Sequence, residues 1–152
     1  MKVSDILRVK GNALFAISPD EPLLLALQVM AERDIGSLVV MEHGDLVGML
    51  TFRECIASMV RNGGVVGPTI VRTVMDDAPL SCTPDTELDE VRRMMLDRHA
   101  RYMPVMTQRT LMGVISLYDV AKAVVDSQDF ENRMLKAYIR DWPAEGQSAT
   151  AG

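Results

Sequence analysis

Hydrophobic positions recur along the chain with two spacings, and each spacing occurs twice in the same order. Apolar side chains fall at helical intervals in residues 23–31 and again in residues 88–95, which predicts two helices with one buried stripe each. Two short apolar runs follow each stretch and are separated by a polar turn, at 42–45 and at 107–110, which is typical of a β-hairpin. A further helix is expected after each hairpin, at 52–60 and at 117–125.

The two stretches are copies of one unit. Each copy also begins with a short extended segment, at 14–17 and at 80–83, so the predicted order of elements is β-α-β-β-α. Because a unit of this size buries little surface alone, we expect an α+β fold in which the copies pack around one continuous core with a pseudo-twofold axis. An offset of 65 positions aligns the copies without a gap, as shown by Ser18-Pro19-Asp20 with Thr83-Pro84-Asp85, Leu23 with Leu88, Met30 with Met95, and Gly48 with Gly113.

The repeat also suggests boundaries along the chain. We assign residues 1–62 to the first repeat, 63–70 to a linker rich in Gly and Pro, and 71–127 to the second repeat. Residues 128–142 are expected to form a C-terminal helix that Pro143 ends, and the small and polar residues 143–152 a disordered tail.

The Pro-Asp pair marks the entry into the first helix of each copy. Asp20 in the first copy and Thr86 in the second are spaced to cap that helix through a side-chain oxygen. Residues 86–89 also have the spacing of a capping box.

Composition and charge narrow the classes of function. Across 152 residues, 48% are apolar and 24% charged, which suits a soluble folded protein. The net charge of −5 would repel a nucleic-acid backbone, so nucleic acid is not an expected partner. No uncharged apolar run approaches the roughly 20 residues that span a bilayer, and residues 1–13 lack the apolar run of a signal peptide. We therefore expect no membrane partner and a cytoplasmic location.

Catalytic and metal-binding patterns are weak. With two histidines, no paired thiolates and no HExxH motif, no metal site is expected. Cys55 and Cys82 are interpreted as reduced thiols rather than a disulfide. Ser116 has no evident histidine partner for nucleophilic catalysis, so the chain is not expected to be an enzyme.

One polar string recurs where each hairpin runs into its second helix. It has the form G-x-x-[ST]-x-x-[DE] and spans residues 48–54 and 113–119. One interpretation is a capping box, in which the hydroxyl and the acid only stabilise the start of the helix. The other is a binding site for a phosphorylated sugar, because a carboxylate accepts hydrogen bonds from ribose hydroxyls while a hydroxyl and free N–H groups donate to phosphate.

With these residues the chain resembles the tandem CBS-domain family, named after cystathionine β-synthase. The resemblance covers residues 1 to about 126 and rests on the Pro-Asp entry, the hairpin and the terminal string, all repeated at one offset. It implies a Bateman module that binds an adenosine-containing ligand between the copies, with AMP favoured and ADP, ATP, NAD or S-adenosylmethionine as alternatives. It also implies a flat homodimer.

The resemblance also implies binding residues. Ser116 would approach the phosphate or ribose and Asp119 would hold the ribose hydroxyls in one cleft, while Thr51 and Glu54 occupy the equivalent positions in the other. Because the family usually has Asp at the last position, and the extra methylene of Glu54 shifts the carboxylate by roughly 1.5 Å, we favour the Asp119 cleft. Further expected contacts lie in the strand before each hairpin turn, inside the string and ahead of Pro-Asp: Arg101, Tyr102, Met103, Pro104, Gly36, Ser37, Leu38, Arg53, Tyr118, Thr83 and Ser18.

Two alternatives stay open at this point. The arginines at 92, 93, 98 and 101 also fit a solvated helix face paired with nearby acids, which is our interpretation of Arg92 and Arg93. For the chain as a whole, we expect a stand-alone regulatory module that binds a nucleotide and signals to an unknown regulated protein by a conformational change. The alternative is a ligand-free scaffold for dimerisation, in which the strings serve as helix caps.

Overall fold

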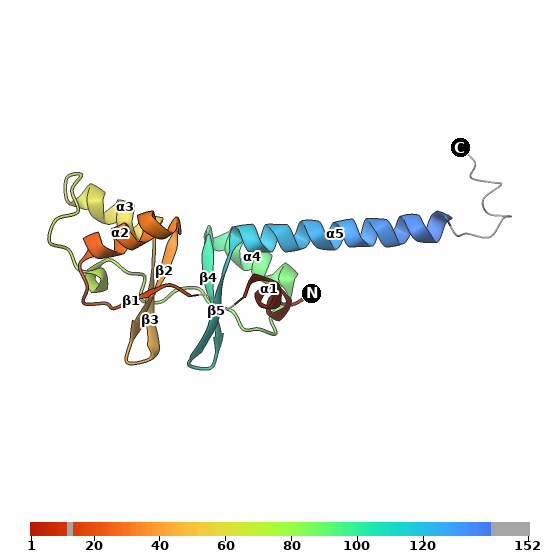
Figure 1. The fold of residues 1–152 in the computed structure, drawn as a ribbon, viewed down its shortest axis with the longest axis horizontal. Coiled ribbons are helices and arrows are strands. Elements are labelled where there is room, and N and C mark those ends of the chain that lie inside the picture. Colours follow the sequence, from red (N-terminus) through yellow and green to blue (C-terminus); the bar gives the residue numbers. More distant parts are fainter. Residues whose placement is uncertain (12–13, 141–152) are drawn as a thin grey trace.

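The protein is described by a computed structural model that covers residues 1–11 and 14–140, and it forms two similar halves side by side (Figure 1). The predicted α+β class and the two β-hairpins are confirmed. In sequence order, the first copy with the segment that precedes it comprises α1 (Val3–Lys10), β1 (Ala16–Ile17), α2 (Leu23–Arg33), β2 (Ser37–Glu42), β3 (Asp45–Thr51) and α3 (Phe52–Arg61). The second copy with its preceding segment comprises a short 3-10 helix, η1 (Val71–Thr73), then α4 (Leu88–Arg98), β4 (Tyr102–Thr107), β5 (Thr110–Ser116) and α5 (Leu117–Arg140).

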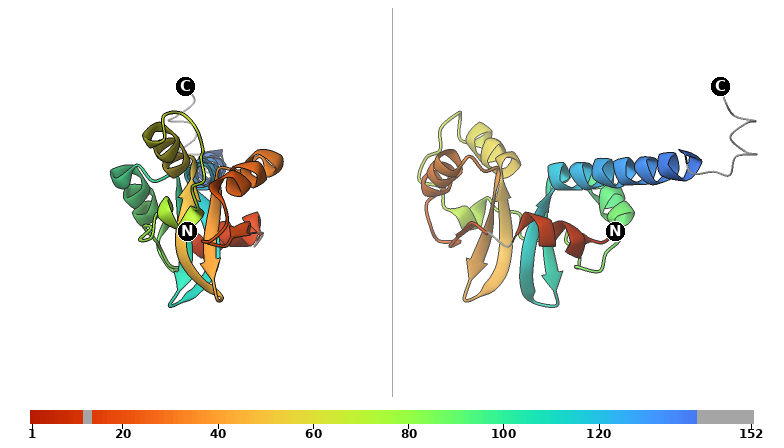
Figure 2. Two further views of the ribbon diagram at one scale, coloured as in Figure 1. Left: turned by 90° about the vertical axis from the view of Figure 1, so that its left-hand side faces the viewer. Right: turned by 45° about the vertical axis from the view of Figure 1, so that its right-hand side comes forward.

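The hairpins of the two halves match in detail. In each, the antiparallel register shifts once, between Val40 and Met41 in β2 and between Val105 and Met106 in β4. Strand β1 adds to β2 in parallel, and Cys82 forms the equivalent bridge to Val105. The hairpins meet along β3 and β5, and helices α2 to α5 gather at one end of the sheets (Figures 1 and 2).

Buried residues form two clusters, so the single continuous core that we expected is wrong. One cluster lies under α2 and the first hairpin, and the other under α4 and the second. The segment that precedes each copy packs in the opposite half: Val71 of η1 is fully buried in the first cluster, and Val3 of α1 is fully buried in the second. Each half therefore depends on residues far away in the sequence to complete its core.

The exchanged segments also explain why the expected helix caps are wrong. The N–H of Leu23 donates to the carbonyl of Thr69 at 2.8 Å, and the N–H of Leu88 donates to the carbonyl of Met1 at 2.9 Å. These hydrogen bonds provide backbone acceptors for N–H groups at the helix starts, which would otherwise need side-chain caps. Asp20 instead pairs with Arg72 at 3.1 Å, and Thr86 accepts from the N–H of Thr83 at 3.0 Å.

The last helix is longer than expected. The sequence suggested two helices, at 117–125 and 128–142, but α5 runs without a break from Leu117 to Arg140. Residues 126–128 contain neither Pro nor Gly, so nothing in them ends the helix. Residues 141–142 and the expected tail at 143–152 lie outside the described residues. Among the helices at 1–11 and 14–140, none combines the length and the apolar character needed to cross a membrane.

Candidate ligand-binding clefts

Both copies of the polar string form capping boxes. In the first, the N–H of Thr51 donates to Glu54 Oε1 at 2.8 Å, and the N–H of Arg53 donates to Thr51 Oγ1 at 3.3 Å. In the second, the N–H of Ser116 donates to Asp119 Oδ2 at 2.8 Å, and the N–H of Asp119 donates to Ser116 Oγ at 3.1 Å. The capping-box interpretation of the two strings is thus confirmed, and hydrogen bonds hold each hydroxyl–acid pair at the start of its helix.

Asp119 has a further partner that the sequence did not suggest. Lys10, the last residue of α1, lies 2.6 Å from Asp119 Oδ2 and also donates to the carbonyl of Val114 at 2.9 Å. Burial alone raises the pKa of the Asp119 carboxyl, but the hydrogen bonds from Lys10 and Ser116 outweigh burial and lower the pKa below its ordinary value. Asp119 is therefore an ionised carboxylate already neutralised by an ammonium group.

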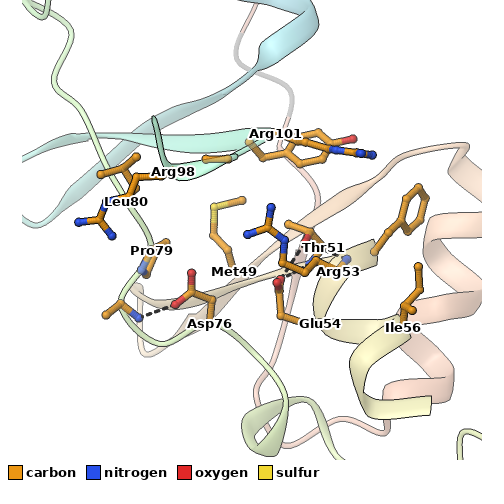
Figure 3. Close-up of a pocket in the computed structure, with 14 residues that line it drawn as sticks. Met49, Thr51, Arg53, Glu54, Ile56, Asp76, Pro79, Leu80, Arg98 and Arg101 are labelled. Atoms are coloured by element: carbon orange, nitrogen blue, oxygen red, sulfur yellow. Dashed lines mark hydrogen bonds between the residues drawn. The ribbon is translucent and has the colours of Figure 1, made fainter. Parts of the chain in front are cut away.

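The first cleft, cleft one, has a volume of about 470 Å³ and opens between the start of α3 and the second half (Figure 3). Its walls come from three segments that are distant in sequence: the end of β3 with α3, the chain at 76–80, and the turn from α4 into β4. The lining residues are Met49, Thr51, Phe52, Arg53, Glu54, Ile56, Asp76, Ala78, Pro79, Leu80, Arg98, Ala100, Arg101 and Tyr102.

Cleft one gathers charged side chains from both halves. Arg53 reaches across from α3 and donates to the carbonyl of His99, while Arg98 and Arg101 approach from the second half. The carboxylates of Glu54 and Asp76 extend toward the same space (Figure 3). The cleft is thus lined by three arginines, the Thr51 hydroxyl and two carboxylates, groups that together suit a ligand carrying both phosphate and vicinal hydroxyls.

The second cleft, cleft two, is wider, at about 750 Å³, and lies at the start of α5. Lys10, which is bonded to the Asp119 carboxylate, lines this cleft, whereas Asp119 itself is not among its lining residues. Its lining residues are Lys10, Leu14, Phe15, Asp34, Ile35, Gly36, Ser37, Val39, Arg101, Tyr102, Val114, Ser116, Leu117, Tyr118 and Ala121.

A single wall separates the clefts. Arg101 and Tyr102 line both of them. A Cβ atom at Gly36 would lie 2.1 Å from the hydroxyl oxygen of Tyr102, so only glycine admits the tyrosine in this position. The two clefts therefore share Tyr102, whose position is fixed against Gly36.

The structure brings most of the sequence-predicted site residues to one of the two clefts. Thr51, Arg53 and Glu54 line cleft one; Gly36, Ser37, Ser116 and Tyr118 line cleft two; Arg101 and Tyr102 line both. Six are not lining residues. Leu38, Met103 and Pro104 are buried, Ser18 and Thr83 are engaged near the Pro-Asp turns, and Asp119 lies behind Lys10.

Sequence reasoning missed several lining residues. Asp76 lies in a segment that showed no motif, and Lys10 lies where the two copies stop aligning. Asp34 aligns with His99 at the repeat offset, and in the structure both adopt a left-handed conformation, with φ of 53° and 52°. Arg98, whose role the sequence analysis left open, lies at cleft one.

The remaining chemistry is limited. In residues 1–11 and 14–140, no group of three or more His, Cys, Asp or Glu side chains could hold a metal ion. Cys55 and Cys82 are free and buried. Burial raises the pKa of the Cys55 thiol to about 11, assisted by Glu54, and that of Cys82 to about 12, so both are thiols at neutral pH.

Comparison with known proteins places these features in a family. The sequence matches the CBS domain twice, over residues 3–61 and 71–126. CBS domain-containing protein YhcV of Bacillus subtilis is 32% identical over 105 residues, covering 69% of this chain and 74% of YhcV. The mitochondrial CBS domain-containing protein CBSX3 of Arabidopsis thaliana is 27% identical over 147 residues, covering 91% of this chain and 71% of CBSX3.

Solved structures share the arrangement of the two halves. A putative signal-transduction protein with CBS domains from Burkholderia ambifaria has a TM-score of 0.78 at 27% identity, covering 84% of this chain and 96% of that one. The fold also matches CBSX2 in complex with AMP, with a TM-score of 0.69 at 21% identity, covering 84% and 98% of the two chains. It matches the CBS domain pair of protein MJ0100, in complex with 5′-methylthioadenosine and S-adenosyl-L-methionine, with a TM-score of 0.71 at 20% identity, covering 84% and 98%. The resemblance inferred from the motifs is thus confirmed, and the chain belongs to the CBS-domain family with two copies of the domain.

Proposed function

We propose that this protein is a regulatory module that binds an adenosine nucleotide, AMP in the first instance, in cleft one. The observation that carries the proposal is that Arg53, Arg98 and Arg101 line the same cleft as the hydrogen-bonded Thr51–Glu54 pair. Such a site has donors for a phosphate on one side and an acceptor for ribose hydroxyls on the other.

Each group has a defined role in this proposal. A guanidinium group has five N–H donors, so Arg53 can keep its bond to the His99 carbonyl and still donate to a phosphate. Glu54 carries a carboxylate that accepts only, and its position at the start of α3 is fixed by the bonds from Thr51. Tyr102 supplies an aromatic surface at the wall between the clefts, which suits an adenine ring.

The ligands of structurally similar proteins support the class of molecule. CBSX2 has been solved with AMP, and the CBS pair of MJ0100 with 5′-methylthioadenosine and S-adenosyl-L-methionine. All three ligands contain adenosine, whereas their phosphate content differs. The arginines of cleft one favour a phosphorylated member of this set, which is why AMP, ADP, ATP and NAD precede S-adenosylmethionine in the proposal.

Cleft two is proposed as the weaker site, which reverses the order that the motif alone suggested. A ribose that used Asp119 would have to displace Lys10 from the carboxylate at 2.6 Å. That exchange costs a charge-assisted hydrogen bond, which offsets the bonds gained from the ligand.

Signalling would follow from the position of cleft one between the halves. A nucleotide there contacts residues of both copies, so it stabilises whichever arrangement of the halves it binds more tightly. A regulated protein could then recognise that arrangement. The proposed chemistry is binding without turnover.

Titration calorimetry on purified protein tests this proposal. We expect AMP to bind the wild type and Glu54→Gln to weaken binding about tenfold to a hundredfold, because the amide lacks the charge that strengthens hydrogen bonds by about 1.5 to 3 kcal/mol. Glutamine preserves the capping box, so the variant should keep its fold. Arg92→Ala, on α4 and paired with Asp89 at 3.4 Å, is the control and should bind as the wild type does. Equal affinities of the wild type and Glu54→Gln would reject the role of Glu54.

A ligand-free scaffold is the second candidate function. It is favoured by the capping boxes, because both polar strings already satisfy their own helix starts. Thermal denaturation separates the candidates: a nucleotide at 100 times its Kd stabilises a binding protein by about 2.7 kcal/mol, and a scaffold shows no shift.

A further inference from the structure

Helix α5 continues far beyond the body of the protein. Val124 is its last residue that packs against the second core in the described chain, yet the helix runs on for about four turns to Arg140 (Figures 1 and 2). The match to the CBS domain also ends at residue 126. The projecting part, residues 126–140, which we call the distal helix, is therefore an addition to the family fold.

The distal helix has a broad apolar face that is exposed. Phe130, Met134, Leu135 and Ile139 are 63%, 57%, 58% and 57% exposed. Ser127, Phe130, Met134 and Ala137 follow one another at intervals of three, four and three, which is the spacing of a seam between paired helices. Because a helix of this length gains little stability in water without packing on its apolar face, a partner surface is expected to cover the seam.

Charge along the distal helix identifies that partner. The acidic residues Asp126, Asp129 and Glu131 all precede Asn132, and the basic residues Arg133, Lys136 and Arg140 all follow it. Two copies of the helix placed antiparallel bring the acidic end of each beside the basic end of the other. A parallel pair would instead place like charges together.

We propose that the distal helices of two copies of this chain pair antiparallel, with a twofold axis near Asn132. Such an interface is self-complementary, as closed dimers require. In this register Phe130 packs against Met134 of the other copy, and Ser127 lies opposite Ala137. The proposal is independent of nucleotide binding, since none of these residues lines either cleft.

A membrane surface fits the same helix less well. Helices that lie on membranes carry Lys and Arg along the polar face, which attract anionic lipids. Here the first part of the distal helix is acidic, so it would be repelled. The change from acidic to basic residues along the distal helix favours a second copy of the chain as the partner.

Sedimentation analysis of the full chain provides the first test. We expect a dimer whose dissociation constant rises at least about tenfold in Arg133→Glu/Lys136→Glu, because two of the three basic residues that face the acidic end of the other copy then become acidic. Adding Asp126→Lys/Asp129→Lys to the same chain restores opposite charges on the two ends and should restore the dimer. A monomeric wild type, or a dimer that the first variant leaves unchanged, would overturn the proposal.

Disulfide trapping tests the direction of pairing. Ser127→Cys and Ala137→Cys chains should form an intermolecular disulfide when mixed, and neither should do so alone, because equal positions lie about 15 Å apart along an antiparallel pair. Wild type is the control, as its two cysteines are buried and free. Efficient trapping of Ser127→Cys with itself would indicate a parallel pair and contradict the proposal.

Discussion

The two clefts have similar backbones but are lined by different charged side chains. Each begins a helix with a hydroxyl–acid capping box and faces a residue in the left-handed conformation, His99 in cleft one and Asp34 in cleft two. Cleft one has Arg53 where cleft two has Tyr118. After duplication, the main chain kept its geometry while the charges diverged, so the fold alone does not determine which cleft binds a phosphate.

The acids of the two capping boxes show the same divergence. Glu54 is bonded to Thr51 and lines cleft one, where arginines approach it. Asp119 is bonded to Ser116 but is covered by Lys10, which comes from α1. The equivalent of α1 in the first half is η1, which is only a short 3-10 helix of three residues. The extra length of α1 is what brings an ammonium group to cleft two.

The largest expected effect is that of replacing Arg53 in cleft one. Arg53→Ala should weaken AMP binding about tenfold to a hundredfold, because a charge-assisted contact to phosphate is lost, and should leave adenosine binding nearly unchanged. Calorimetry with both ligands measures the difference. Tyr118→Ala, the matched position in cleft two, is the control and should leave AMP binding within about threefold. An equal loss for AMP and adenosine would mean that Arg53 acts on the fold and not on phosphate.

A second prediction concerns the effect of Lys10 on ligand binding in cleft two. Lys10→Met should release Asp119 and increase the affinity of cleft two for AMP by about tenfold, since the ligand no longer displaces an ammonium group. Measured in the Glu54→Gln background, where cleft one is weakened, the gain is assigned to cleft two. Lys10→Arg keeps the positive charge and should show no gain. Unchanged affinity in Lys10→Met would show that Lys10 does not obstruct this cleft.

Local patterns predicted the elements that depend on nearby residues. The hairpins, their turns and the two polar strings are confirmed as structure because alternation and capping act over a few positions. The continuous α5 was predicted as two helices, at 117–125 and 128–142, although residues 126–128 contain neither Pro nor Gly to interrupt it.

Contacts between distant segments could not be predicted in this way. The burial of Val3 under α4 and of Val71 under α2 depends on segments that cross between the halves. The Lys10–Asp119 pair joins residues 109 positions apart. No periodicity in one sequence connects such positions, so the sequence analysis favoured the Asp119 cleft on its motif alone and could not take the Lys10 contact into account.

The smallest expected effect is on stability, and it follows from the lowered pKa of Asp119. An acid whose pKa is lower in the folded state stabilises the fold above its ordinary pKa of 3.8, and this stabilisation disappears as the pH falls through the lowered value. Lys10→Met removes the hydrogen bond that lowers the pKa of Asp119 most strongly against the effect of burial. At neutral pH it should therefore reduce the free energy of unfolding by about 1 kcal/mol.

Urea denaturation at a series of pH values measures this effect. The difference in free energy of unfolding between the wild type and Lys10→Met should be largest at neutral pH. It should approach zero in acid, where Asp119 is protonated in both proteins. Arg8→Met is the control because its pair with Asp5 is exposed, so a loss near zero is expected. A gap that persisted unchanged in acid would mean that the stem of Lys10 stabilises the protein by packing, and that its charge on Asp119 contributes nothing measurable to the difference between the two clefts.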